Sequence, residues 1–117
     1  MEEHPELKIQ LFHGGGHLPY QIGRLDRAYE MRKETSKKIT RKPSEYLKMF
    51  YFDTIIHSSE ALDYLINLVG PEQVMVGSDY PFDMGSYQFN DLLDEINISE
   101  ADKEKIKSEN AERLFQV

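Results

Sequence analysis

Three short runs of apolar, aromatic and β-branched residues recur along the chain, and a stretch with helical spacing follows each run. These runs cover 7–12, 49–56 and 73–81 and are predicted to be strands. The third run is nearly all apolar at its start, which is typical of a strand buried on both faces of a sheet. Because strands that alternate with helices indicate βαβ units, the pattern predicts an α/β fold with a parallel sheet.

Helical spacing is clearest between the second and third predicted strands. Apolar residues at three- and four-residue intervals form one face of this helix: Leu62, Leu65, Ile66 and Val69. Ser58 or Ser59 is the expected N-cap, and Gly70 with Pro71 ends the helix. The predicted helices cover 23–33, 42–48, 58–70 and 99–115. The polar segment between the first two is expected to be a loop or a frayed helix.

Length, composition and charge narrow the possible functions. A chain of 117 residues with 39% hydrophobic content has the size of one domain. The net charge of −7, from 21 acidic and 14 basic residues, argues against nucleic acid as a partner. Cysteine is absent, so disulfides, cysteine-ligated zinc and a thiol nucleophile are excluded. Neither a membrane span nor a signal peptide is recognisable, and we expect a soluble, cytoplasmic protein that does not bind membranes.

Polar side chains collect where the predicted strands end. His13, Asp53, His57 and Asp79 all lie at or just beyond a strand terminus. In parallel α/β folds, the carboxyl ends of the strands carry the chemistry, so this edge of the sheet is the predicted site. Asp53 and His57 are interpreted mainly as structural residues that turn the second strand into its helix.

The segment HGGGHLPYQIGR, residues 13–24, is the most unusual stretch and admits several interpretations. Pro19 stands where a dinucleotide-binding fingerprint requires its third glycine, and a Walker loop is absent. The G-x-S-x-G elbow of an esterase is also missing. Three glycines make a zinc-binding helix through His13 and His17 unfavourable. What remains is a strand-end histidine followed by a backbone that turns tightly and lies close to other atoms.

Three segments together resemble a known family. HGGGHLPYQIGRLDRAYEMR, YFDTIIHSSEAL and VMVGSDYPFDMG are similar, in order and spacing, to the C-terminal part of the amidohydrolase-related decarboxylases. This family includes aminocarboxymuconate-semialdehyde decarboxylase and γ-resorcylate decarboxylase. The resemblance implies a partial (β/α)8 TIM barrel: residues 1–117 would form a single C-terminal fragment containing strands six to eight with their helices.

The resemblance also implies roles for individual residues. His13 resembles a catalytic histidine that acts on metal-bound water or assists proton transfer, and Asp79 resembles a ligand of a divalent metal, usually zinc. Arg32 resembles an arginine that binds a substrate carboxylate. Arg24 resembles one that reaches towards the neighbouring subunit's site in family dimers. The implied activity is decarboxylation, or less favourably hydrolysis, of a small molecule that carries a carboxylate.

Part of the family's metal site has no counterpart in the sequence. The family also uses an H-x-H pair on its first strand and a histidine on its fifth, and none of the four histidines here forms an H-x-H. We therefore expect the chain alone to bind zinc weakly and to lack activity, because catalytic zinc takes three protein ligands. The expected partners are a missing N-terminal barrel portion or further copies of the chain, bound at sheet edges left open on both sides. The alternative is a non-catalytic interaction or regulatory module that uses the same edges.

Overall fold

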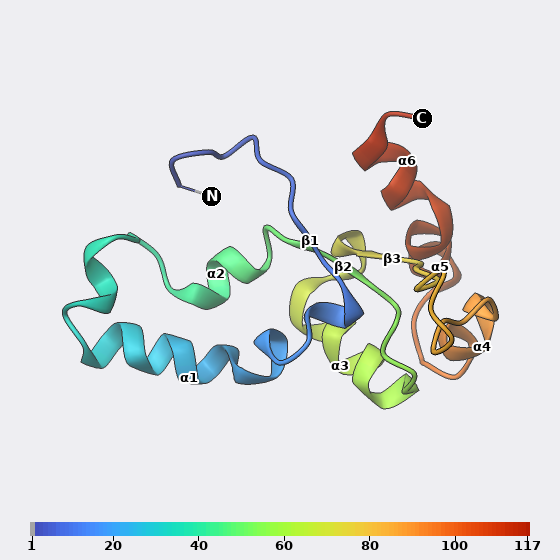
Figure 1. The fold of residues 1–117 in the computed structure, drawn as a ribbon, viewed down its shortest axis with the longest axis horizontal. Coiled ribbons are helices and arrows are strands. Elements are labelled where there is room, and N and C mark those ends of the chain that lie inside the picture. Colours follow the sequence, from blue (N-terminus) through green and yellow to red (C-terminus); the bar gives the residue numbers. More distant parts are fainter. Residues whose placement is uncertain (1) are drawn as a thin grey trace.

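A parallel sheet of three short strands lies at the centre of the chain (Figure 1). The computed structural model describes residues 2–117, apart from the side chains of Ser36, Phe89 and Asn90. The strands β1 (Gln10–Leu11), β2 (Tyr51–Asp53) and β3 (Val74–Met75) lie in the order β1-β2-β3, and both pairs are parallel. The predicted α/β class and the parallel sheet are therefore confirmed. All three carboxyl ends meet at one edge.

The paired segments are shorter than the predicted strands, because the ends of the runs leave the ladder to form turns and loops. Phe12, for example, accepts a turn hydrogen bond from Gly15 N through its carbonyl oxygen, at 3.0 Å. β1 and β3 also have only one strand neighbour each, so pairing is confined to residues that face β2. Within the predicted run 7–12, only Gln10–Leu11 is strand.

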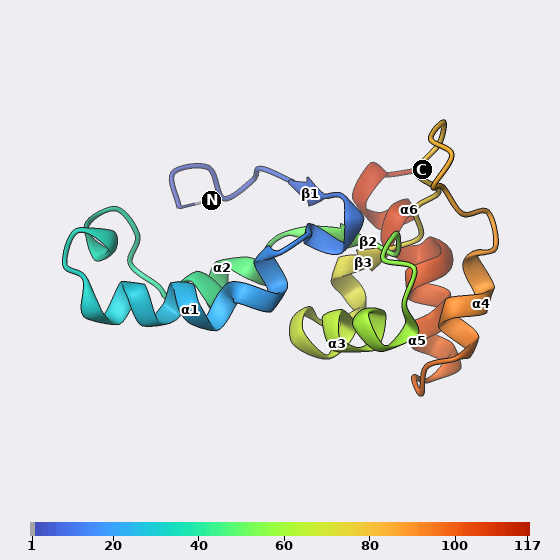
Figure 2. The same ribbon diagram turned by 60° about the horizontal axis from the view of Figure 1, so that its bottom comes forward.

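Helices surround the sheet on three sides (Figures 1 and 2). They are α1 (Leu18–Met31), α2 (Pro43–Leu47), α3 (Ser59–Val69), α4 (Phe89–Asp94), α5 (Glu100–Glu104) and α6 (Asn110–Phe115), with 3₁₀ turns at His13–Gly15, Thr35–Lys37 and Pro71–Gln73 and a π-helical turn at Lys105–Glu109. None of the helices in the described part of the chain has the length and apolar character of a membrane span.

Most predicted helices are present, with two differences. α1 begins before the predicted start near Gly23, because Pro19 occupies its first turn, where a missing N–H costs no hydrogen bond. α4 falls in a stretch for which the sequence predicts no helix. The predicted cap of α3 is confirmed and is Ser58, whose Oγ accepts a hydrogen bond from Ala61 N at 3.2 Å.

The core lies between the sheet, α3 and the C-terminal helices. Fully buried side chains come from each of these elements: Phe52, Leu62, Val74, Leu93 and Ile106. The predicted apolar face of α3 is buried over its whole length. This packing fixes the direction in which β2 and β3 deliver their carboxyl ends to the site.

The C-terminal segment covers the outer edge of β3. Val76 N donates to Ile106 O at 3.1 Å, and the buried Asn110 side chain donates to Val74 O at 2.8 Å and to Pro71 O at 2.7 Å. The π-helical turn releases a carbonyl such as that of Ile106 from the regular helical ladder. The expectation that both sheet edges are open is therefore wrong for β3, whose outward N–H and C=O groups already have partners.

An ion-pair network holds the same segment against the turn before β3. Lys105 Nζ lies 2.8 Å from Asp102 Oδ1 and 2.9 Å from Glu72 Oε1. Hydrogen bonds to Asp102 and then to Glu72 raise the pKa of the Lys105 ammonium above its ordinary value. The contact links the C-terminal helices to the 3₁₀ turn that leads into β3.

We expect Leu62→Ala to lower the free energy of unfolding by about 2–5 kcal/mol, because it removes a fully buried side chain from the core. Leu25→Ala makes the same change on α1 at a side chain that is 40% exposed, and we expect a loss below about 1 kcal/mol. Urea unfolding followed by circular dichroism measures both. Equal losses from the two variants would contradict the described core.

Candidate active site

The glycine-rich segment forms a tight turn directly after β1. His13, Gly14, Gly15 and Gly16 all have positive φ, at 55°, 57°, 81° and 58°. A Cβ on Gly14 would lie 2.5 Å from the Ile56 side chain, and one on Gly15 would lie 2.8 Å from the Phe52 ring. The predicted tight turn and close backbone approach are both present, so the glycines place the His13 backbone against β2.

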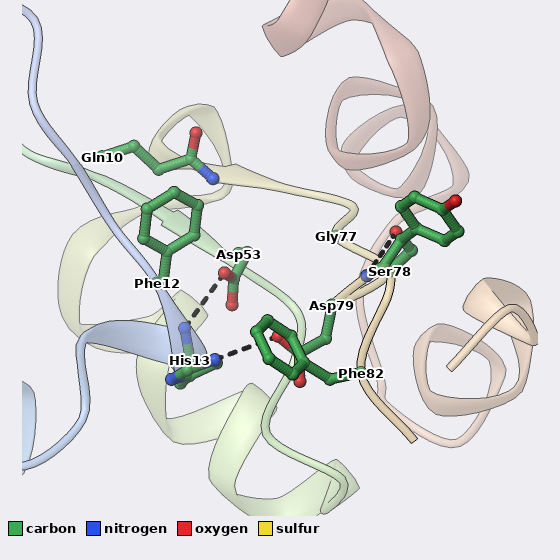
Figure 3. Close-up of a pocket in the computed structure, with 9 residues that line it drawn as sticks. Gln10, Phe12, His13, Asp53, Gly77, Ser78, Asp79 and Phe82 are labelled. Atoms are coloured by element: carbon green, nitrogen blue, oxygen red, sulfur yellow. Dashed lines mark hydrogen bonds and ion pairs between the residues drawn. The ribbon is translucent and has the colours of Figure 1, made fainter. Parts of the chain in front are cut away.

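The turn brings His13 next to Asp79, which follows β3. His13 Nε2 lies 3.2 Å from Asp79 Oδ1, and the two side chains point toward each other in Figure 3. The imidazole is 63% exposed, whereas the carboxylate is only 14% exposed. Asp79 also has positive φ, at 59°. Two residues that are far apart in the sequence thus meet at the predicted edge of the sheet.

Asp53, at the end of β2, holds the turn that carries His13. Its side chain is 3% exposed. Oδ2 accepts a hydrogen bond from His13 N at 3.0 Å, and Oδ1 accepts from Gly14 N at 3.0 Å and from Ile55 N at 3.1 Å. This arrangement supports the structural role expected for Asp53. The first two bonds join the turn that follows β1 to the end of β2.

A pocket of about 430 Å³ opens beside the His13–Asp79 pair. Its lining combines aromatic rings with polar groups from all three strand ends: Gln10, Phe12, His13, Asp53, Gly77, Ser78, Asp79, Tyr80 and Phe82. The aromatic residues among them were not predicted as site residues. The sequence could have indicated two of them by their position next to predicted site residues: Phe12 directly precedes His13, and Tyr80 directly follows Asp79.

A second pocket of about 360 Å³ borders the same pair. His57, another residue with positive φ, lines it together with Ile55 and Met84. His57 lies just before the N-cap of α3 and is exposed. His57 therefore lines a pocket beside the His13–Asp79 pair and also belongs to the turn that leads into α3.

The two predicted substrate-binding arginines lie elsewhere. Arg24 is exposed on α1, and Arg32 is exposed at the C-cap of that helix. Neither is among the residues that line the two pockets beside the His13–Asp79 pair. Their assigned roles stay predictions.

The described residues do not fit a complete metal site. Across residues 2–117, no group of three or more His, Asp or Glu side chains is arranged to hold a metal ion. Asp79 and His13 offer suitable donor atoms, but a catalytic zinc takes three protein ligands.

Comparison with known proteins identifies the family. The model of the amidohydrolase family, Amidohydro_2, matches residues 1–117. The chain belongs to this amidohydrolase family. Curated family members include the 2-amino-3-carboxymuconate-6-semialdehyde decarboxylase of Dictyostelium discoideum, which is 37% identical over 109 residues, 92% of this chain and 30% of the relative. The gamma-resorcylate decarboxylase of Rhizobium sp. is 32% identical over 123 residues, 99% of this chain and 36% of the relative.

Solved structures of decarboxylases are also similar to this chain. The 5-carboxyvanillate decarboxylase LigW from Sphingomonas paucimobilis matches with a TM-score of 0.85 and 32% identity over 99% of this chain and 36% of that chain. A dihydroxybenzoic acid decarboxylase from Polaromonas, solved with manganese and the inhibitor 2-nitroresorcinol, matches with a TM-score of 0.82 and 32% identity over 98% and 35%. The chain spans about a third of the length of these decarboxylases. The resemblance stated from the motifs is confirmed.

Proposed function

We propose that this chain supplies the C-terminal third of a metal-dependent decarboxylase that acts on a carboxylated aromatic or related small molecule. Its strands would be the sixth to eighth of a (β/α)8 barrel. The observation that carries the proposal is the His13 imidazole 3.2 Å from the Asp79 carboxylate, at the carboxyl edge of a parallel sheet. The relatives named above are all decarboxylases.

In this proposal, His13 is the catalytic proton donor. Loss of carbon dioxide breaks a carbon–carbon bond and leaves the electron pair on the substrate carbon, which then takes a proton. An imidazole suits this task because it can hold and release a proton near neutral pH. Phe12 and Phe82 would pack against a substrate ring at the pocket wall. Arg32 remains the proposed partner of a substrate carboxylate, because a guanidinium fork suits one. Arg24 remains the proposed arginine that reaches towards the site of a neighbouring subunit.

Asp79 is the proposed metal ligand of this chain. The Polaromonas structure contains manganese, so manganese and zinc are both candidates. Because a single carboxylate and one neighbouring imidazole are too few ligands, we expect the 117-residue chain to bind either ion only weakly. Isothermal titration calorimetry of the purified chain tests this. Stoichiometric binding with a submicromolar Kd would contradict it.

A chimera tests the function directly. This chain would replace the matched segment of the Dictyostelium relative, which provides the remaining part of the enzyme. We expect manganese- or zinc-dependent release of carbon dioxide from 2-amino-3-carboxymuconate 6-semialdehyde. The intact relative is the positive control, and the relative without its matched segment is the negative control. A folded, metal-loaded chimera without activity on this substrate or on carboxylated phenols would contradict the proposal.

The surface beside the site favours association with a further polypeptide. Four side chains that line the two pockets are exposed by 66–75%: Phe12, Tyr80, Phe82 and Met84. At β1, Ile9 O accepts from Tyr51 N at 2.9 Å, so the backbone of the alternate residue Gln10 faces away from β2. We propose that a missing barrel portion, or a further copy of the chain, covers this surface. A non-catalytic binding module is favoured instead if the chain binds such a portion and the assembled complex stays inactive.

A further inference from the structure

The end of the central strand holds both loops of the site. Asp53 binds the turn that carries His13 through two backbone N–H groups. The next residue, Thr54, is 5% exposed, and its Oγ1 accepts a hydrogen bond from Gly77 N at 3.3 Å. Gly77 lies two residues before Asp79. The last residue of β2 and the residue that follows it are therefore bonded to the two loops on either side.

Packing reinforces the second of these contacts. A Cβ on Gly77 would lie 2.9 Å from Asp53 Cβ and 3.3 Å from the Ile55 side chain. The loop that leads to Asp79 thus packs directly against Asp53, the residue that fixes the turn carrying His13. A displacement of Asp53 would disturb both sides of the site at once.

The reacting groups need such support because their backbone conformations are unfavourable. His13 and Asp79 both have positive φ, at 55° and 59°, in a region that residues other than glycine rarely occupy. Such conformations persist only where surrounding contacts determine them. Asp53 and Thr54, both buried, supply such contacts: Asp53 bonds to the turn that carries His13, and Thr54 bonds to the segment that leads to Asp79.

We propose that Asp53 and Thr54 are positioning residues that together set the distance between His13 and Asp79. The inference rests on the proposed function for its catalytic meaning, while the geometry it describes is measurable without activity. Neither side chain is assigned contact with substrate. Asp53 fixes the His13 backbone, and Thr54 fixes the backbone that delivers Asp79.

Nuclear magnetic resonance of the ¹⁵N-labelled 117-residue chain tests the proposal. At one fixed pH, Asp79→Asn is expected to change the ring ¹⁵N shifts of His13, and this change reports the contact between the two side chains. In the Asp53→Asn background, we expect the same substitution to produce less than about half of that change. Exchange of at least one of the His13 and Gly14 amide protons is expected to rise at least about tenfold, because asparagine keeps only one of the two oxygens that accept from these amides.

Thr54 provides a matched pair of variants that keeps the test decisive if Asp53→Asn does not fold. Thr54→Ser keeps the hydroxyl acceptor for Gly77 N, whereas Thr54→Val keeps the shape and removes it. We expect the response of His13 to Asp79→Asn to survive in Thr54→Ser and to shrink in Thr54→Val. An unchanged response in Thr54→Val, or an equal loss in both variants, would overturn the positioning role.

Activity measurements separate this inference from the proposed function. If the chimera is inactive while the shift response depends on Asp53 and Thr54, the function is wrong and the positioning stands. If the chimera is active and Asp53→Asn leaves its kcat and the shift response unchanged, the positioning is wrong and the function stands.

Discussion

Replacing His13 with asparagine in the chimera is expected to lower kcat by about 10²–10⁴-fold. Asparagine occupies similar space and can still hydrogen-bond Asp79, but it cannot transfer a proton in the reaction. The substrate still enters the same pocket, so we expect KM to change much less than kcat. Carbon dioxide release at saturating substrate measures kcat, and a substrate titration gives KM.

His17→Asn is the matched control, because it makes the same chemical change at an exposed residue of the same glycine-rich segment. His17 is the N-cap residue of α1 and makes no side-chain capping bond. We expect its kcat to stay close to that of the unmodified chimera. A similar loss in both variants would show that His13 acts through the fold of the segment rather than through proton transfer.

The position of the site could be predicted because it depends on topology. In a parallel sheet, the carboxyl ends of the strands share one edge, so locating three strands was sufficient to expect His13 and Asp79 near each other. The glycines could be interpreted in the same way, because consecutive glycines signal a turn with positive φ. Both inferences start from patterns within short segments: the apolar runs that mark the strands and the consecutive glycines that mark the turn.

The contacts that support the site could not be predicted in this way. The carboxylate of Asp53 accepts hydrogen bonds from backbone N–H groups about forty residues away, and no side-chain pattern marks a backbone donor. The same holds for the bond between Gly77 N and Thr54. Asp53 could be interpreted as structural from its place at a strand end, but its partners depend on how β1 and β3 pack beside β2.

Short elements were the other features missed. α4 has six residues, which is too short for a helical period to emerge from the sequence. It is stabilised by burial, since Leu93 is fully buried in the common core. The closed edge of β3 likewise depends on the π-helical turn and on Asn110, which reaches Val74 only in the folded chain.

Replacing Asp79 with asparagine is expected to lower the metal affinity of the chimera by at least about 10–100-fold, with loss of activity at limiting metal. Substituting residues that merely support a metal ligand commonly costs this much, so loss of a ligand's charge should cost no less. The Asp79 side chain is only 14% exposed and lies 3.2 Å from the His13 imidazole, so the substitution removes a carboxylate that is largely shielded from solvent. Competition with a fluorescent chelator measures the affinity for manganese and for zinc.

Asp91→Asn provides the comparison, because it makes the same chemical change at an exposed carboxylate on α4, away from the pocket residues. We expect its metal affinity to match that of the unmodified chimera. If Asp79→Asn retained full affinity, the metal would be held entirely by the part of the enzyme that this chain does not contain. The nearby imidazole would then face a carboxylate with no ligand role, and Asp79 would act only by orienting His13 through their 3.2 Å contact.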